Sequence, residues 1–297
     1  MTILIKLLGL LCFFPVTVNA DELPPLPGER HDIGGYQLHI NCMGQGSPTI
    51  IIDTGLGDDS SDWQLILEQS AQISKTCVYD RSGYGWSDYG PRPRNSRRIA
   101  YELGLLLQQA NIPAPYILVG HSFGGYNMRM FAAIHPQKIS GLILVDASHE
   151  HQYERLDIHI PRSSRRIRSI ISLPSTMIKE FPLNQKNQLL QDRAFRTARH
   201  EISSLYQSSK QVQRFGSIPT VPLIVISRGI EEWFGNDTAR QREKTWIRLQ
   251  QDLTFLSPLS QHIFAHHSGH NIHQQQPEII VDAISEVTHL ARVMSSP

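Results

Sequence analysis

The sequence predicts an α/β protein with a mostly parallel sheet covered by helices on both faces. Short apolar runs of strand length alternate with helical stretches along most of the chain, as in proteins built from strand–helix–strand units. At residues 117–124 an apolar run ends in the pattern G-H-S-F-G, and a helical stretch follows at once. The 297 residues suffice for one large domain of this class or for two small ones.

Seven segments are expected to be strands. The first alternates apolar and polar residues, as a half-exposed strand does, and most of the later ones are continuous apolar runs typical of buried parallel strands. In chain order the expected strands are 36–42, 49–52, 76–79, 116–119, 141–145, 223–226 and 262–265. Helical stretches are expected at 63–73, at 98–110, from 126 to the proline at 136, and from Pro277 onward.

The alternation stops between residues 148 and 215. This stretch has no strand-like run, and it carries twelve Lys or Arg residues against six Asp or Glu. Part of it, about 189–206, is expected to be helical. We interpret 148–215 as a helical insertion over the carboxyl ends of the strands, where open α/β sheets bind ligands. Its basic charge is expected to be a solvated surface.

The first twenty residues have the pattern of a secretory signal peptide. An almost wholly apolar run at 7–18 follows Lys6, and the small residue Ala20 precedes Asp21. Residues 1–20 are therefore expected to be removed, which leaves a domain at 21–297 in a periplasmic or secreted protein. The alternative is an uncleaved anchor, although the apolar run is shorter than the roughly 20 residues that a spanning helix needs.

Cysteine content and net charge narrow the class of protein. Beyond the signal peptide only Cys42 and Cys77 remain, and an even pair in an exported protein favours a disulfide over two free buried thiols. The net charge of +1 gives no reason to expect a nucleic acid as a partner.

Ser122 lies between Gly120 and Gly124 at the predicted strand-to-helix turn. Such a turn is so tight that the flanking positions need glycine, and it leaves the serine hydroxyl exposed as a nucleophile. An incidental serine in a glycine-rich turn is the alternative. The chain also has a histidine, His270, just past the last expected strand, and a loop G-L-G at 55–57 that could direct a backbone N–H into the same site.

A metal site is not expected from the clustered histidines. Two groups stand out, and neither has the spacing of known zinc motifs. The C-terminal group also has no acidic or cysteine partner among its members. The histidines of these groups are His149 and His151, and His262, His266, His267, His270 and His273.

In these features the chain resembles serine hydrolases of the α/β-hydrolase fold, in particular exported bacterial members. Residues 79–88, YDRSGYGWSD, are also close to the D-R-x-G-x-G-x-S loop of that superfamily. The resemblance covers about residues 32–293 and implies an eight-stranded, mostly parallel sheet, with the insertion at 148–215 as a lid and no cofactor. One departure is Thr54-Gly55, which stands where many members have His-Gly.

The resemblance implies a role for each candidate residue. Ser122 would be the nucleophile and His270 its base, while the backbone N–H groups of Leu56 and Phe123 would form the oxyanion hole. The acid is less clear. Asp146 follows the strand next to the nucleophile strand and is favoured, because an acid that orients a histidine should be fixed and buried. Glu232 and Asp237, after the following strand, are the alternatives.

The resemblance also implies a disulfide and a reaction. In the strand order of the family, the strand ending at Cys42 lies beside the one that starts near Cys77, so the two cysteines can pair. The expected reaction is hydrolysis of a small-molecule carboxylic ester or related acyl bond through an acyl-enzyme. An acyltransferase on the same three residues and a non-catalytic binding protein of the same fold are the alternatives. The acyl group, the alcohol and the oligomeric state stay open.

Overall fold

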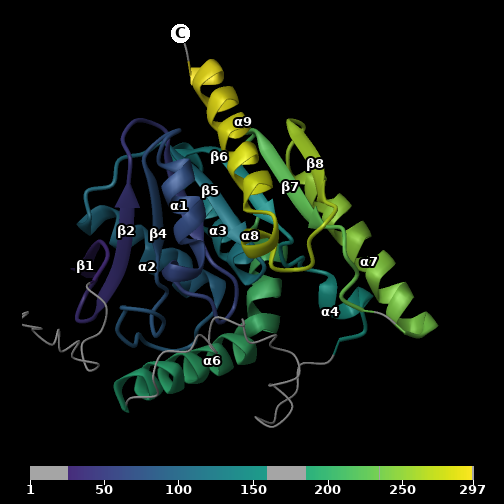
Figure 1. Cartoon of the computed structure of the whole chain (residues 1–297), viewed down its shortest axis with the longest axis horizontal. Coiled ribbons are helices and arrows are strands. Elements are labelled where there is room, and N and C mark those ends of the chain that lie inside the picture. Colours follow the sequence, from purple (N-terminus) through teal and green to yellow (C-terminus); the bar gives the residue numbers. More distant parts are fainter. Residues whose placement is uncertain (1–25, 159–184, 234, 296–297) are drawn as a thin grey trace, which may run out of the picture.

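A computed structural model describes residues 26–158, 185–233 and 235–295. Its centre is one eight-stranded sheet, as the family resemblance implies, and the strands lie in the order β1-β2-β4-β3-β5-β6-β7-β8 (Figure 1). The strands are β1 (Glu29–Asp32), β2 (Gln37–Met43), β3 (Thr49–Asp53), β4 (Thr76–Tyr79), β5 (Tyr116–His121), β6 (Ile139–Val145), β7 (Leu223–Arg228) and β8 (Ser260–Ala265). Neighbours from β4 to β8 pair in parallel, whereas β1 and β2 add an antiparallel edge.

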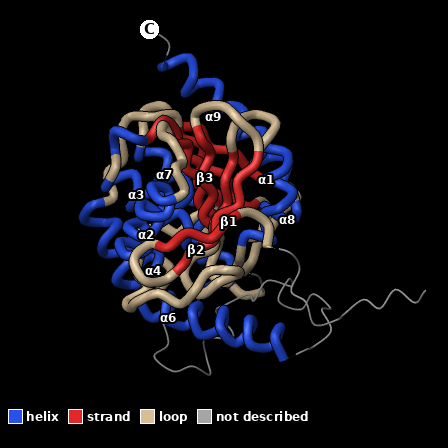
Figure 2. The backbone as a smooth tube through the Cα atoms, turned by 90° about the vertical axis from the view of Figure 1, so that its left-hand side faces the viewer, coloured by secondary structure: helices blue, strands red, loops and turns tan. Residues whose placement is uncertain are grey.

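Helices cover both faces of the sheet, which confirms the predicted fold class (Figure 2). One face carries α1 (Gln64–Ser70), α8 (Ile272–Gln275) and α9 (Pro277–Ser295). The other carries α2 (Ser96–Gln109), α3 (Phe123–Ile134) and α7 (Asp237–Leu253). The alternating side chains of each strand divide the core, so that Ile117 and Val119 face one layer while Leu118 faces the other.

The parallel register brings the carboxyl ends of the central strands to one edge. Asp53 at the end of β3 pairs with Gly120 of β5, and His121 pairs with Val145 at the end of β6. On the other side of β6, Val145 pairs with Ile226 of β7. The residues that follow β3, β5, β6 and β7 therefore lie next to one another, and this edge holds the candidate site.

The described part of the insertion expected at 148–215 contains two helices and no strand. It contains the short α4 (Gln152–Arg155) and the long α6 (Gln185–Phe215), which lies across the carboxyl-end edge of the sheet in Figure 1. Residues 159–184 of this segment and the expected signal peptide at 1–20 lie outside the described residues. A lid role for the insertion stays a prediction. No helix in the described ranges has the length and apolar character to cross a bilayer.

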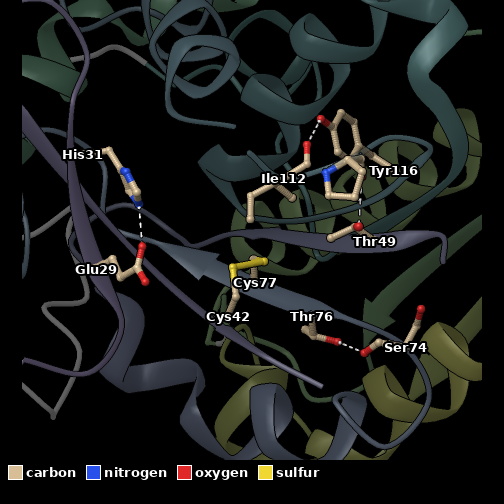
Figure 3. Close-up of a disulfide and its surroundings, with 10 residues drawn as sticks. Glu29, His31, Cys42, Thr49, Ser74, Thr76, Cys77, Ile112 and Tyr116 are labelled. Carbon is tan, nitrogen blue, oxygen red and sulfur yellow. Dashed lines mark hydrogen bonds and ion pairs between the residues drawn. A yellow bond between two sulfur atoms is a disulfide. The ribbon is translucent and has the colours of Figure 1, made fainter. Parts of the chain in front are cut away.

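A disulfide joins Cys42 of β2 to Cys77 of β4 (Figure 3). The two residues are directly opposite each other in the antiparallel pair, and their Cα atoms lie 4.1 Å apart. The strand order that the family implies is therefore present, and it places the predicted partners together. The bond links the antiparallel edge covalently to the parallel part of the sheet.

Candidate active site

Ser122 occupies a strained turn between β5 and α3. Its φ of 52° lies in the left-handed region, which non-glycine residues adopt at a cost. A Cβ on Gly120 would come within 2.8 Å of the Gly124 carbonyl oxygen, and one on Gly124 within 2.3 Å of the Asp53 carbonyl oxygen. Because backbone atoms cannot move away easily, both positions need glycine. The turn thus holds the serine side chain out from the strand and helix backbones.

His270 lies on the loop after β8, and its ring faces Ser122. Its Nε2 is 3.0 Å from the Ser122 Oγ. The backbone N–H and C=O of His270 are both hydrogen-bonded. The Glu232 carboxylate accepts the His270 backbone N–H at 2.8 Å, and the His121 Nε2–H donates to the His270 carbonyl oxygen at 3.0 Å.

Asp146 contacts the ring nitrogen of His270 that faces away from Ser122. It directly follows β6, is fully buried, and its Oδ2 lies 2.5 Å from the His270 Nδ1. Trp246 donates its indole N–H to Asp146 Oδ1 at 2.7 Å, and Arg228 donates to Oδ2 at 2.9 Å. Burial would raise the pKa of Asp146, but the Arg228 charge and the hydrogen bonds from His270 and Trp246 outweigh it and hold the pKa below its ordinary value.

The other two candidate acids lie elsewhere. The Glu232 carboxylate contacts the backbone of His270 rather than its ring. Asp237 begins α7, and its carboxylate is 96% exposed and pairs with Arg240 at 2.5 Å. Of the three acids, only Asp146 contacts the imidazole of His270.

The two predicted oxyanion donors sit on adjoining loops. Phe123 is the first residue of α3, and Leu56 lies on the loop after β3, which touches the helix start at Gly124. The backbone N–H of Phe123 lacks an intrahelical acceptor because it belongs to the first turn. Among the described residues, neither this N–H nor that of Leu56 donates to a protein acceptor. Both groups are therefore available to an oxygen bound beside Ser122.

Sequence reasoning missed the side chains that hold the carboxylate of Asp146 in place. Arg228 ends β7, and its guanidinium bridges Asp146 and the carboxylate of Glu243 on α7. A single arginine at the end of an apolar run was the available signal for it. Trp246, which lies 100 positions from Asp146, gave no such signal.

One group of described residues could hold a metal ion. Its ligand atoms belong to Asp58, His121 and His273, lie within 4.8 Å of one another and are buried. None of the histidine groups considered from the sequence contains all of them. Catalytic zinc sites use three protein ligands and structural ones use four, so the number of ligands does not decide the question. The three side chains also face one another, with Asp58 Oδ2 3.5 Å from His121 Nδ1, and we propose no metal for them.

A model of the alpha/beta hydrolase fold matches residues 48–169, which include β3 to β6 with Ser122 and Asp146. The chain has the α/β-hydrolase fold. Solved structures share it over most of their length. A putative lipase from Acinetobacter baumannii superposes with a TM-score of 0.69 at 14% identity, covering 91% of this chain and 93% of that one. A thermophilic esterase from Thermogutta terrifontis gives 0.63 at 19% identity, covering 86% and 94%.

Two curated relatives differ in how much of their own length this chain covers. The uncharacterized protein YqjL of Bacillus subtilis is 26% identical over 271 residues, which are 91% of this chain and 95% of that protein. A probable transporter from Hormonema carpetanum is 32% identical over 139 residues, but the chain spans only 20% of that longer protein.

Proposed function

We propose that this α/β-hydrolase is a serine esterase that cleaves small-molecule carboxylic esters through an acyl-enzyme. The observation that carries the proposal is the continuous contact from Ser122 Oγ to His270 at 3.0 Å and from His270 to Asp146 at 2.5 Å. A nucleophile, a base and a buried acid in this order are the groups that acyl transfer to and from serine needs.

The reaction follows from the positions of these groups. His270 Nε2 takes the Ser122 proton as Oγ attacks the acyl carbon, and the Leu56 and Phe123 N–H groups bind the oxyanion that forms. Asp146 holds the Nδ1–H tautomer and stabilises the imidazolium. His270 then protonates the departing alcohol, and water, activated by the same base, hydrolyses the acyl-enzyme and restores Ser122.

Two further observations support parts of the proposal. Solved structures of similar fold include the Thermogutta esterase and an enol-lactonase from Burkholderia xenovorans, so esters and lactones are the first substrates to try. The Cys42–Cys77 disulfide is of a kind that persists in oxidising compartments, which supports export of the chain to the periplasm or the medium.

The test is ester turnover and covalent labelling of the intact protein. We expect wild-type protein to hydrolyse p-nitrophenyl esters of graded acyl length and to gain one phosphonyl group on Ser122 from a fluorophosphonate. Ser122→Ala should lose both, with turnover reduced by at least about 10³-fold. Ser140→Ala is the matched control, because its hydroxyl binds the Tyr116 carbonyl within the sheet. Equal turnover in Ser122→Ala and wild type would contradict the proposal.

A further inference from the structure

The loop after β4 contains a buried arginine that the esterase chemistry leaves unexplained. Arg81 belongs to the 79–88 motif, and its side chain is fully buried at the carboxyl-end edge of the sheet. Its NH1 donates to Asp53 Oδ1 at 2.6 Å and to the Thr54 carbonyl at 2.7 Å. Its NH2 donates to the Gly55 carbonyl at 2.8 Å. The guanidinium thus binds three consecutive residues at the end of β3.

The other side of the guanidinium binds the insertion helix α6. Arg81 Nε donates to Glu201 Oε1 at 2.9 Å, and NH2 lies 3.2 Å from Oε2. Tyr84 donates its hydroxyl to the same carboxylate at 2.8 Å. Burial opposes the charge, but the carboxylates of Glu201 and Asp53 keep the pKa of Arg81 well above its ordinary value. Arg81 is therefore a permanently charged link between α6 and the loop after β3.

The hydrogen bond to the Gly55 carbonyl has a consequence for Leu56. In a trans peptide the C=O of one residue and the N–H of the next point in opposite directions. The Gly55 carbonyl and the Leu56 N–H belong to one peptide group. Because Arg81 holds that carbonyl, it directs the Leu56 N–H away from the guanidinium and fixes the plane of the peptide.

Stability alone gives a weak reason for this arrangement. Apolar residues of similar volume are often as stabilising as a buried ion pair, since burial removes the hydration of both charges. What an apolar substitute cannot supply is the directed donation to two successive backbone carbonyls, Thr54 and Gly55.

We propose that Arg81, anchored on Glu201 of α6, is a positioning residue that orients the Leu56 N–H of the oxyanion hole. The expected effect on kcat rests on the proposed esterase function. The expected effect on the loop after β3 rests only on the contacts of Arg81. It also means that α6 takes part in the site through Glu201, although that carboxylate is buried behind the loop.

The chain offers a matched control for Glu201. Glu102 on α2 is also a buried carboxylate that binds an arginine, Arg94, at 2.6 and 2.8 Å and accepts a tyrosine hydroxyl, that of Tyr36, at 2.9 Å. Neither Glu102 nor Arg94 contacts the loop after β3. Glu201→Gln and Glu102→Gln therefore remove similar interactions, and only the first acts on the oxyanion loop.

The experiment compares these two variants in the full-length protein by kinetics and by hydrogen exchange. For Glu201→Gln we expect kcat to fall about tenfold with KM within about twofold, because a displaced donor acts on the transition state. The inhibition constant of an alkyl boronic acid, which mimics the tetrahedral state, should rise by the same factor because the inhibitor binds more weakly. Amide exchange of residues 54–58 should speed up. Glu102→Gln should leave kcat, boronate inhibition and exchange at 54–58 within about twofold of wild type.

Equal effects of the two variants on kcat and on exchange at 54–58 would overturn the proposal. If Glu201→Gln does not fold, Tyr84→Phe removes one hydrogen bond from Glu201 and should show the same pattern to a smaller degree. Should wild-type protein lack ester turnover, the proposed function fails while the exchange measurement still decides whether Arg81 and Glu201 fix the loop.

Discussion

Two buried arginines, Arg81 and Arg228, flank the candidate nucleophile, and they use the same chemistry in different ways. Each follows or ends a strand at the carboxyl-end edge, and each bridges two carboxylates from different elements. Arg81 also donates to backbone carbonyls of the loop after β3. The guanidinium of Arg228 donates only to side chains among the described residues. One of these, the carboxylate of Asp146, also contacts the ring of His270.

From this difference we infer that one ion-pair network acts on the position of a backbone loop and the other on the charge of a carboxylate. The carboxylate of Asp53 faces Arg81 and the hydroxyl of Tyr79, so its charge is neutralised away from the reacting groups. The carboxylate of Asp146 contacts the guanidinium of Arg228 and the ring of His270, which becomes a cation in the proposed reaction. We therefore expect Arg81 to control the geometry of the oxyanion loop and Arg228 to control the electrostatics of the acid.

The largest expected effect is the difference in turnover between substitutions of Asp146 and of Asp53. In Asp146→Asn, turnover should fall by about 10³- to 10⁴-fold, because an amide cannot stabilise the imidazolium and favours the wrong tautomer of His270. Asp53→Asn should lower turnover by no more than about tenfold and mainly reduce the unfolding free energy. Steady-state kinetics and urea unfolding of both variants test this. Full turnover in Asp146→Asn would remove Asp146 from the mechanism.

The second effect is a change in pH dependence. Arg228→Gln removes the positive charge beside Asp146, so the pKa of that carboxyl should rise toward its ordinary value. The acid limb of the kcat/KM profile, which reports proton uptake by the proposed acid–base pair as a unit, should then move upward by about 0.5–1 pH unit. Arg81→Gln should lower the rate without moving the limb, since Arg81 contacts neither Asp146 nor His270. Equal shifts in the two variants would contradict the division of roles.

A smaller effect is expected from the alternative acids. Glu232→Gln should lower turnover by no more than about threefold, because a glutamine oxygen can still accept the His270 backbone N–H. Asp237→Asn should match wild type, since it removes only an exposed ion pair. Measured kcat values decide this. A drop of several hundredfold in Glu232→Gln would place the acid after β7.

The smallest effect on turnover is expected at His149, which lies beside the ion pair of Arg129 and Glu150. Arg129 binds Glu150 at 2.6 and 2.8 Å, and the neighbouring His149 is buried. Burial lowers the pKa of His149 to about 4 from 6.5. The unfolded chain therefore binds this proton near pH 6.5 and the folded chain only near pH 4, so the stabilising contribution of the neutral ring is complete above pH 6.5 and is lost as the pH falls toward 4.

His149→Asn should remove that contribution. Between pH 7 and pH 5, we expect the wild type to lose about 1–2 kcal/mol more unfolding free energy than the variant, while the two have similar turnover at pH 7. Urea unfolding at the two pH values measures the difference. Equal losses in the two proteins would show that His149 does not take up a proton on unfolding.

The parallel strands were predictable because burial on both faces leaves a strong apolar signal. The turn at Ser122 was predictable because its tight approach requires Gly120 and Gly124 on either side. By contrast β1, with the sequence ERHD, is a polar edge strand without apolar pattern, and it was missed. The helix α7 was also missed, although Asn236 caps its start and Trp246 and Leu249 recur at helical spacing.

The contacts of the candidate site were only partly predictable. Ser122, His270 and Asp146 could be placed because each follows a strand whose carboxyl end faces the same edge. Arg228 and Trp246 could not, since they reach Asp146 from 82 and 100 positions away and no local pattern records such a contact. The catalytic roles, the lid and the signal peptide stay predictions.

The position of His270 along the chain bears on how the site forms during protein synthesis. Ser122 and Asp146 follow neighbouring strands, β5 and β6, whereas His270 arrives only after β8, and α9 then packs against α1 from the beginning of the domain. A ribosome that synthesises the chain from its N-terminus releases Ser122 and Asp146 first. Under the mechanism proposed above, the nascent protein cannot activate Ser122 until β8 and the loop with His270 have reached the sheet edge.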